Sequence, residues 1–313
     1  MKKPLIVIAG PTACGKTDIS IDLAEKIGGE IISGDSMQVY KYMDIGTAKV
    51  TKEEMRDIPH YLVDELYPDE EYNVMLFQQK AKQYMEGIYS RGHIPIIVGG
   101  TGFYINALVY DNDFSEEEES EIRKELYAVA ENEGAEKLHA MLAEVDPEYA
   151  ANIHHNNVKR VARALEYYRL TGEKMSEHNK NAKKKETPYN LAFFVLNMDR
   201  EKLYERINLR VDIMMKNGLE QEVRKLIEMG YSPELVSMQG LGYKEFIPYF
   251  NGEISLEQVV DDIKKYTRRF AKRQLTWFRG QTNGTWLDMG TLSKDKALEI
   301  MLDELKTKKI IEG

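Results

Sequence analysis

The sequence predicts an α/β protein in which helices flank a parallel sheet, with an all-helical insertion domain between two parts of the core. Residues 5–9 form a short apolar run that leads into a glycine-rich loop, and residues 17–27 then follow a helical pattern. Further apolar runs at 30–33 and 93–98 alternate with helical stretches, which is typical of a doubly wound parallel sheet. Between 116 and 170 the pattern is helical throughout, so this stretch is expected to leave the sheet.

The domain boundaries follow from where the alternating pattern stops and resumes. Residues 1–112 and 188–313 are predicted to form the core, and 113–187 the helical insertion. Asp199 and Ser255 stand where helix N-caps are expected, each at the start of a long helix. The other expected elements are helices at 116–132, 135–144, 157–170 and 293–308 and strands at 191–197 and 285–287.

The composition is that of a globular protein, with 42% hydrophobic and 30% charged residues. No apolar run approaches the roughly 20 residues of a membrane span, and the single cysteine, Cys14, excludes an internal disulfide. We therefore expect a cytoplasmic protein that meets no membrane, and we infer no stable protein partner. The net charge of −9 opposes nucleic-acid binding when taken as a whole. Residues 264–279, however, hold Lys and Arg without any acid, so this stretch could follow phosphates.

A phosphate-binding loop is the strongest motif in the chain. The pattern G-x-x-x-x-G-K-[ST] stands between an apolar run and a helical stretch, the context that a P-loop requires, so the sheet is expected to be P-loop NTPase-like. Backbone N–H groups of such a loop hold phosphate, Lys16 adds a positive charge, and Thr17 offers a hydroxyl to phosphate or to Mg²⁺, directly or through water. The residues predicted to bind a diphosphate or nucleotide are Gly10, Pro11, Thr12, Ala13, Cys14, Gly15, Lys16 and Thr17.

The loop does not identify the reaction, because kinases, ATPases and GTPases share it. A nucleotide hydrolase usually has an acid for Mg²⁺ at the end of a later apolar strand, whereas the run at 94–98 is followed by Gly99-Gly100-Thr101. Hydrolysis of ATP is therefore disfavoured. Asp35 follows the strand at 30–33, and from spacing alone it is either a functional carboxylate beside the phosphate loop or the N-cap of a helix that begins at Ser36.

An ordered series of motifs runs along nearly the whole chain: 10–17 (GPTACGKT), 35–40 (DSMQVY), 43–49 (MDIGTAK), 58–60 (IPH), 98–102 (VGGTG), 160–166 (RVARALE) and 271–277 (AKRQLTW). This series resembles the bacterial tRNA dimethylallyltransferases, or tRNA isopentenyltransferases, of the IPP transferase family. It is far more specific than a P-loop alone. Cys14 stands at a variable position of the loop, and Gly34 where the family often has alanine, so neither departure removes a reactive group.

The resemblance implies transfer of a dimethylallyl group from dimethylallyl diphosphate to N6 of adenine 37 in the tRNA anticodon loop, with release of diphosphate and with Mg²⁺ as cofactor. Asp35 would take the proton of the adenine amine, Thr101 would orient that amine, and Arg210 would contact the diphosphate. The helical insertion would help to bind the anticodon stem-loop. The implied tRNA contacts are Asp35, Ser36, Met37, Gln38, Thr101, Lys159, Arg160, Val161, Ala162, Arg163, Gln239, Gly240, Lys244, Lys272, Arg273, Gln274 and Arg279.

Other interpretations remain open at this point. Without the family, Arg210 would be taken for a solvated helix charge, and Trp277 and Phe278 are assigned to packing because aromatic residues at helical spacing usually belong to a core. His154-His155 lacks companion ligands at metal spacing, so no zinc site is expected. Alternative functions are an adenine-nucleotide isopentenyltransferase, a P-loop small-molecule kinase and an RNA-binding switch gated by nucleotide.

Overall fold

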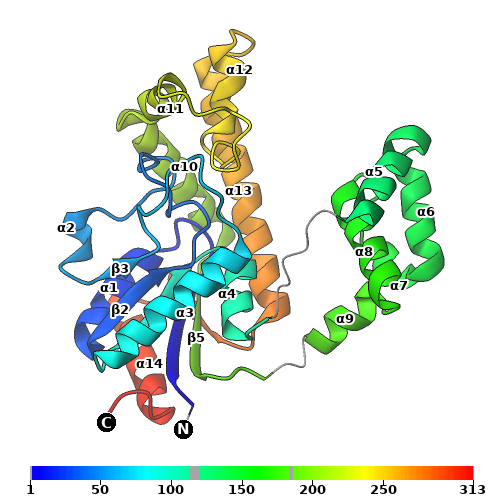
Figure 1. Ribbon diagram of the computed structural model, residues 1–313. Coiled ribbons are helices and arrows are strands. Elements are labelled where there is room, and N and C mark those ends of the chain that lie inside the picture. Colours follow the sequence, from blue (N-terminus) through cyan, green and yellow to red (C-terminus); the bar gives the residue numbers. More distant parts are fainter. Residues whose placement is uncertain (1, 113–119, 183–185, 313) are drawn as a thin grey trace. The chain divides into compact units, whose positions relative to one another are not determined.

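The core of the protein is a six-stranded sheet in which all strands are parallel. The computed structural model describes residues 2–112, 120–182 and 186–312. Within these ranges the strand order is β3-β2-β4-β1-β5-β6, with β1 and the phosphate loop near the middle (Figure 1). The expected P-loop-like parallel sheet is thereby confirmed. The strands are β1 (Pro4–Ala9), β2 (Gly29–Ser33), β3 (His60–Tyr61), β4 (Ile94–Gly99), β5 (Asn190–Asn197) and β6 (Thr285–Asp288).

Alternate residues of the strands face two hydrophobic clusters, one on each side of the sheet. In β1, Leu5 and Val7 pack into the cluster that contains α3 and α4, while Ile6 and Ile8 pack into the one that contains α1 and α14. Both faces of the parallel sheet are thus covered, as such sheets require. The core helices are α1 (Lys16–Ile27), α2 (Lys52–Met55), α3 (Val74–Ser90), α4 (Gly102–Val109), α10 (Arg200–Lys216), α11 (Leu219–Glu228), η1 (Lys244–Phe246), α12 (Ile247–Phe250), α13 (Leu256–Gln281) and α14 (Lys294–Thr307).

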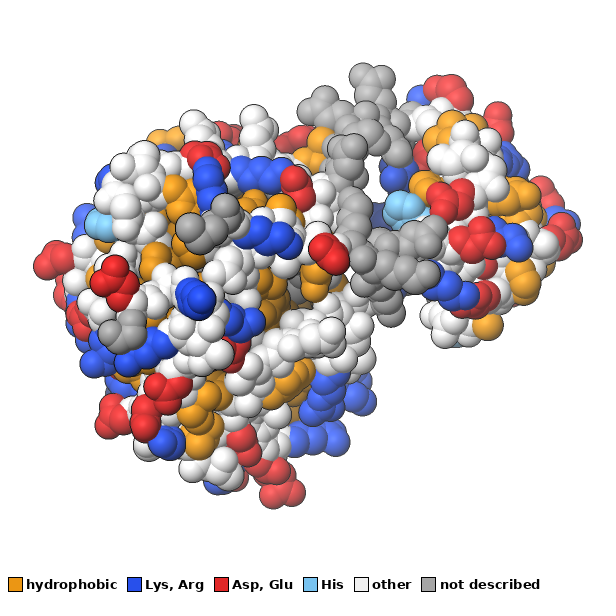
Figure 2. All heavy atoms as spheres, turned by 90° about the horizontal axis from the view of Figure 1, so that it is seen from below, with side chains coloured by type: hydrophobic (Ala, Val, Ile, Leu, Met, Phe, Trp, Pro, Cys, Tyr) orange, Lys and Arg blue, Asp and Glu red, His pale blue; other side chains and the backbone are white. Residues whose placement is uncertain are grey.

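Two long helices, α10 and α13, pack side by side and extend past the edge where the strands end, with α11 and α12 beyond it (Figure 1). Both begin at the expected caps: the Asp199 side chain accepts from the N–H groups of Glu201 and Lys202, and the Ser255 hydroxyl from that of Gln258. Figure 2 shows the face of the core that lies on the side of the N- and C-termini. Basic and acidic side chains are mixed on this face, so no single sign of charge dominates it.

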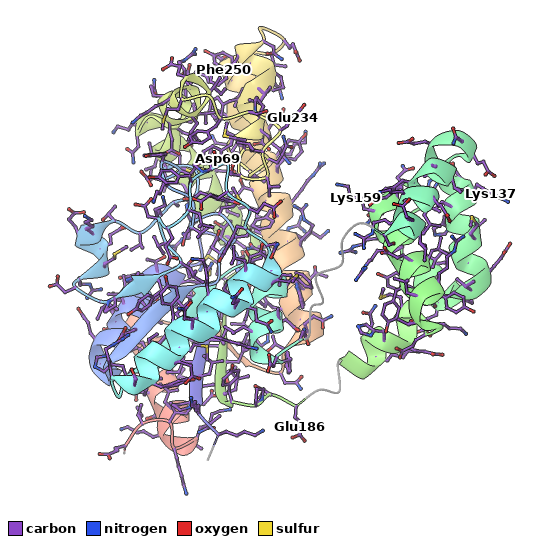
Figure 3. All side chains as sticks on the ribbon, in the orientation of Figure 1. Asp69, Lys137, Lys159, Glu186, Glu234 and Phe250 are labelled. Atoms are coloured by element: carbon purple, nitrogen blue, oxygen red, sulfur yellow. The ribbon has the colours of Figure 1, made fainter. Side chains whose placement is uncertain are left out.

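The residues from 113 to 186 form a second compact unit, separate from the unit of 1–112 and 187–313. The chain therefore rejoins the core at Thr187, one residue before the expected position. Leu126, Leu138 and Leu142 are central to its own small core. Lys137 and Lys159 project from different helices of this unit (Figure 3). Its helices are α5 (Glu121–Glu133), α6 (Ala135–Val145), α7 (Pro147–Ala150), α8 (Val158–Thr171) and α9 (Met175–Ala182).

Some elements differ from expectation. Helix α5 begins at Glu121, capped by Ser120, and the expected residues 116–119 of that helix lie outside the described ranges. The expectations did not include α3 or the edge strand β3, which has only two residues. None of the helices in the described ranges combines the length and the apolar content that a membrane span needs.

Candidate active site

The phosphate loop joins β1 to α1 and curls through three residues with positive φ. These are Gly10 (150°), Ala13 (64°) and Gly15 (94°), and only the middle one carries a side chain. No side chain caps the first turn of α1, so its N–H groups remain available to an anion. The backbone therefore has the form of a phosphate cradle.

Lys16 and Thr17 stand at the start of α1, where the motif predicts them. The Lys16 ammonium folds back over the loop and donates to the carbonyl oxygens of Gly10 at 3.0 Å and Pro11 at 2.7 Å. The side chain of Thr17 is exposed at the mouth of the cradle. Mg²⁺ usually keeps several waters and binds substrate phosphates, so the Thr17 hydroxyl beside a diphosphate fits such an ion. No cluster of three or more His, Cys, Asp or Glu suited to a metal occurs within the described ranges.

Arg210, from α10, lies against the phosphate loop and is not a solvated helix charge. Its Nη1 donates to the Thr12 hydroxyl at 3.3 Å. Burial lowers the pKa of the Arg210 guanidinium below its ordinary value, and the negative charge of the Asp35 carboxylate opposes that shift. An arginine remains protonated even so. A half-buried cation therefore lies against the phosphate loop, where the charge of the Asp35 carboxylate reaches it.

Asp35 follows β2, and residues 36–39 form a bend and a turn, so its interpretation as a helix N-cap is wrong. Instead Asp35 Oδ1 accepts from the N–H of Met37 at 2.8 Å. The Thr101 hydroxyl oxygen, which follows β4, accepts from the N–H of Ser36 at 3.2 Å. The two segments are brought together at the edge where the strands end.

Close backbone packing fixes this meeting point. A Cβ on Gly99 would lie 2.3 Å from the backbone of Gly34, so position 99 admits only glycine. The N–H of Thr101 also donates to the carbonyl of Gly34 at 3.3 Å. Asp35 and Thr101, which are 66 positions apart, are thus carried by segments in direct contact.

Two tyrosines, Tyr72 and Tyr104, lie within electrostatic range of the Asp35 carboxylate, and sequence reasoning did not include them. Burial, followed by the charges of Tyr40 and Asp35, raises the pKa of Tyr104 to about 12. Burial also raises the pKa of Tyr72, and the nearby Tyr104 and Asp35 raise it further. The ring centroids of Tyr72 and Tyr104 are 5.9 Å apart. Both phenols therefore stay neutral beside Asp35, but periodicity alone cannot distinguish them from ordinary core residues.

Gln38 and Met37 are engaged mainly with protein. Gln38 Oε1 accepts from the Ser33 hydroxyl at 3.1 Å, and its Nε2 donates to the carbonyls of Thr47 and Ala48, both at 3.3 Å. The Met37 methyl presses on Gly240, where a Cβ would lie 2.4 Å from it. Ser36 and Met37 remain half-buried at the site, whereas Gln38 would have to give up a bond to reach a base.

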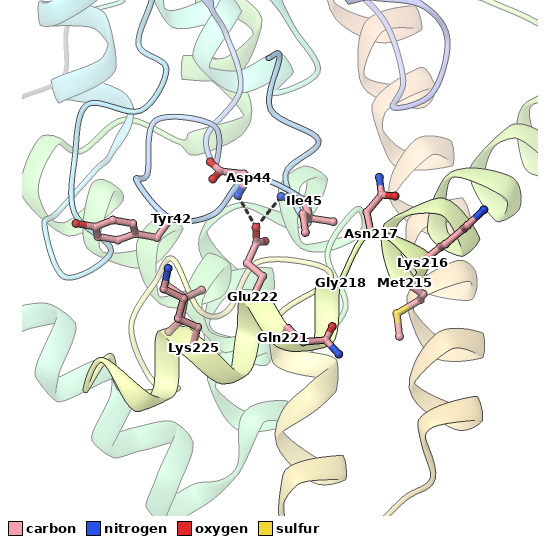
Figure 4. A pocket seen from close by; sticks show the side chains of 11 residues that line it. Tyr42, Asp44, Ile45, Met215, Lys216, Asn217, Gly218, Gln221, Glu222 and Lys225 are labelled. Atoms are coloured by element: carbon pink, nitrogen blue, oxygen red, sulfur yellow. Dashed lines mark hydrogen bonds between the residues drawn. The ribbon is translucent and has the colours of Figure 1, made fainter. Parts of the chain in front are cut away.

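Glu222, on α11, supports the loop at 44–46 and was also missed. Its carboxylate accepts from the N–H groups of Asp44, Ile45 and Gly46 at 2.9, 2.7 and 3.0 Å, two of which are drawn in Figure 4. The Tyr243 hydroxyl donates to the same carboxylate at 2.8 Å. An acid on a helix does not reveal such a role in sequence, because the loop that it holds lies far away in the chain.

The basic stretch of α13 contains residues bound to polar side chains and residues exposed to solvent. Lys264 pairs with Asp212, Lys265 with Asp262 at 3.1 Å, and Arg268 donates to Asn208 at 2.6 Å. Lys272, Arg273 and Arg279 are exposed, with the last two guanidinium groups over the rings of Phe270 and Trp286. These three are available to an RNA.

The structure corrects one of the expected RNA contacts, Gln274. It is only 5% exposed, and both ends of its amide bind protein, so it does not lie on the RNA-facing surface. Phe278 is buried, and the Trp277 indole packs on Gly102, which agrees with their assignment to packing. The rings of His154 and His155 are tilted, with centroids 4.2 Å apart, and no metal cluster includes them in the described part of the chain.

Two expected RNA contacts on helix α8 are also corrected by the structure. Val161 and Ala162 are fully buried in the core of the helical unit, so they cannot contact RNA as expected. Arg163 donates to Glu166 at 3.0 Å. Lys159 and Arg160 are exposed at the start of the helix. In the other unit, Gln239 and Lys244 are also exposed, and Gln239 Nε2 donates to a backbone carbonyl at 2.8 Å.

Comparison with known proteins gives the family. Residues 38–281 match the family model described as IPP transferase. This chain belongs to the IPP transferase family. A tRNA dimethylallyltransferase of Lachnoclostridium phytofermentans is 54% identical over 310 residues, which are 99% of both chains. The resemblance inferred from the ordered motifs is confirmed.

Solved structures of similar proteins share the fold. The full-length tRNA isopentenylpyrophosphate transferase of Bacillus halodurans superposes with a TM-score of 0.76 at 44% identity, over 98% of this chain and 97% of that one. A eukaryotic dimethylallyltransferase, described as acting on tRNA, superposes with a TM-score of 0.81 at 33% identity, over 97% of this chain and 80% of that one. The parallel sheet and the edge described above are therefore those of a tRNA-modifying prenyltransferase family.

Proposed function

We propose that this protein transfers a dimethylallyl group from dimethylallyl diphosphate to N6 of adenine 37 in the anticodon loop of tRNA. One observation carries the proposal: a phosphate cradle and a carboxylate share the edge of one sheet, and Arg210 bonds to the cradle within reach of the carboxylate's charge. The strand β4 ends in glycines rather than in an acid, which argues against hydrolysis of ATP. Family membership supplies the reaction class that fits both features.

The donor half of the reaction is a charge problem. As the bond between the allylic carbon and its oxygen breaks, the electron pair leaves with the diphosphate, and negative charge grows there. Lys16, Arg210 and the N–H groups of the loop would stabilise that charge. A Mg²⁺ bound through Thr17 would neutralise part of it.

The acceptor half is a proton problem. The lone pair of the adenine N6 forms the new bond to carbon, and the amine then loses a proton. Asp35, whose Oδ1 accepts from the Met37 N–H, would receive that proton as the general base. The Thr101 hydroxyl, which already contacts the segment of Asp35, would orient the amine.

The acceptor base must leave its stack in the RNA to reach this edge. The exposed Lys272, Arg273 and Arg279 of α13 offer phosphate contacts, together with Lys244. In the helical unit, Lys159 and Arg160 offer further ones, so this unit would contribute to binding of the anticodon stem-loop. Exposed basic side chains within each unit would offset the net charge of −9.

The test is transfer of label from dimethylallyl diphosphate to unmodified tRNA, followed by nucleoside analysis. Incorporation at one adenine next to the anticodon is expected, with diphosphate as the other product. Consumption of ATP with a phosphorylated product would instead favour a kinase. Binding of both ligands without any turnover would favour an RNA-binding switch.

A further inference from the structure

Gln274 connects two loops that the chemistry needs. On α13 its neighbours Lys272 and Arg273 are exposed, yet Gln274 is buried. Its Oε1 accepts from the N–H of Thr12 in the phosphate loop at 3.0 Å. Its Nε2 donates to the carbonyl of Gly100, after β4, at 2.9 Å. One side chain thus ties the donor loop to the segment that carries the acceptor residue Thr101.

The segment at 99–102 is shaped to receive this helix. A Cβ on Gly100 would lie 2.2 Å from Gln274 Nε2, and one on Gly102 would lie 2.8 Å from the Trp277 indole. Both glycines therefore allow α13 to approach the segment closely. Such contact makes the separation of the two loops depend on the position of one helix.

Further hydrogen bonds extend from the two segments that Gln274 connects. Towards the donor, the Thr12 hydroxyl accepts from Arg210 at 3.3 Å. Towards the acceptor, the Thr101 hydroxyl accepts from the N–H of Ser36 at 3.2 Å, next to Asp35. A connected path therefore runs from the cation at the diphosphate site to the carboxylate, and Gln274 is its central link.

We propose that Gln274 is a positioning residue that sets the distance between donor and acceptor, a role that rests on the function proposed above. Transfer requires the allylic carbon and N6 to meet in line, and a misplacement of about 1 Å can cost about a hundredfold in rate. Gln274 uses both ends of its amide on protein, so its loss acts on geometry rather than on the affinity of either ligand. The rate should therefore fall while binding is retained.

The first variant is Gln274→Met, which keeps the length and the apolar stem but removes both hydrogen bonds. The single-turnover rate with saturating tRNA and donor should fall by about tenfold to a hundredfold. The Kd of inorganic diphosphate and the Kd of tRNA should each stay within about threefold. Gln258→Met is the matched control, because Gln258 is exposed on the same helix and bonds to Ser255 and Asp262 near the start of that helix, so that variant should keep the full rate.

A second variant disturbs the same contact of the Gln274 amide, from the side of Gly100. Gly100→Ala would push the Gln274 amide away, since the added carbon would meet Nε2. If both changes break one link, the double variant should be no slower than the slower single variant. Losses that multiply would show two independent effects and would overturn the link. This variant also carries the test if Gln274→Met does not fold.

The possible results separate the two proposals. A wild-type protein that transfers nothing to tRNA would contradict the proposed function itself. An active wild type with an equally active Gln274→Met variant would overturn the positioning role alone. A variant whose rate and two affinities fall together would also overturn it, because that pattern indicates general loosening of the structure.

Discussion

Two basic helices, one in each unit of the chain, carry residues expected to contact tRNA, and their buried faces differ. On α13, Gln274 is buried against the phosphate loop beside the exposed Lys272 and Arg273. On α8, Val161 and Ala162 are buried in the helical unit's own core. The same kind of motif therefore serves two structural purposes.

The difference shows which charges are connected to the chemistry. The exposed basic residues of α13 stand on the helix whose Gln274 binds both the phosphate loop and the segment after β4. On α8, the buried Glu166 binds Arg123 and Arg163, so part of the basic character of this helix stabilises its own unit. On α13 we expect a change of the buried Gln274 to affect catalysis and changes of the exposed Lys272 or Arg273 to affect RNA binding, whereas changes on α8 should affect binding and local stability only.

The largest effect is expected for Asp35→Asn, at the edge to which α13 is joined. The amide keeps the shape but cannot take a proton, so transfer should fall by about a hundredfold or more. The Kd of tRNA should change little. Asp69→Asn, an exposed acid of the same unit (Figure 3), should keep full activity. An active Asp35→Asn protein would remove the proposed base.

Arg210→Ala should follow, with a loss of about tenfold to a hundredfold in transfer, because one stabilising group for the leaving diphosphate is gone. Diphosphate binding, measured by calorimetry, should weaken as well, and tRNA binding should not. Leu209→Ala alters the exposed neighbour on the same helix and serves as the control. Unchanged diphosphate binding in Arg210→Ala would contradict the contact.

Changes at Lys272 or Arg273 to Ala should weaken tRNA binding without weakening diphosphate binding. Each true phosphate contact should contribute about one unit to the slope of log affinity against log salt. Lys264→Ala is the control within the same stretch, since Lys264 pairs with Asp212. An equal change of slope in the control would mean that total charge matters rather than the exposed face.

Glu166→Gln tests the expectation that part of the charge on α8 stabilises the helical unit itself. The carboxylate is fully buried, and burial would raise its pKa, but hydrogen bonds from Arg123, Ser120 and Arg163 lower it below the ordinary value. Removing a buried charge partner costs roughly 3–5 kcal/mol, so the helical unit should lose protection against hydrogen exchange. Glu125→Gln changes an exposed acid on α5 and should not do so. Diphosphate binding by the core should persist in both variants.

The smallest effect concerns Glu30, at the start of β2 and away from the site. Burial would raise its pKa, but hydrogen bonds from Arg91, Tyr61 and His93 outweigh it and lower the pKa to about 2. A lowered folded pKa gives stability that is present above the ordinary value of 4.5 and is lost as pH falls towards 2. The melting temperatures of wild type and Glu30→Gln should therefore differ at neutral pH and converge in acid. A constant difference would contradict this.

Much of the fold could be predicted because its signals are local. The P-loop pattern, the caps at Asp199 and Ser255, and the apolar strands depend on neighbouring residues in the chain. The edge strand β3 and the helix α3 were missed, the first because two residues give no periodic pattern.

The site could be predicted only where a motif names its residues. Asp35, Thr101 and Arg210 do lie around one edge. Gln274 was misassigned and Glu222 was missed, because their partners lie far away in sequence and a helical position does not show which side chain turns inward. Burial of this kind is decided by tertiary packing.

The central claim is that the core edge acts on an adenine held within RNA. It is tested most directly by offering the wild-type protein labelled dimethylallyl diphosphate with either an anticodon stem-loop or adenosine monophosphate, in single-turnover reactions. We predict transfer to the stem-loop and none to the free nucleotide, because the free nucleotide lacks the RNA backbone phosphates that the basic residues of α13 would bind. Transfer to both acceptors at similar rates would contradict the account and would indicate an adenine-nucleotide isopentenyltransferase.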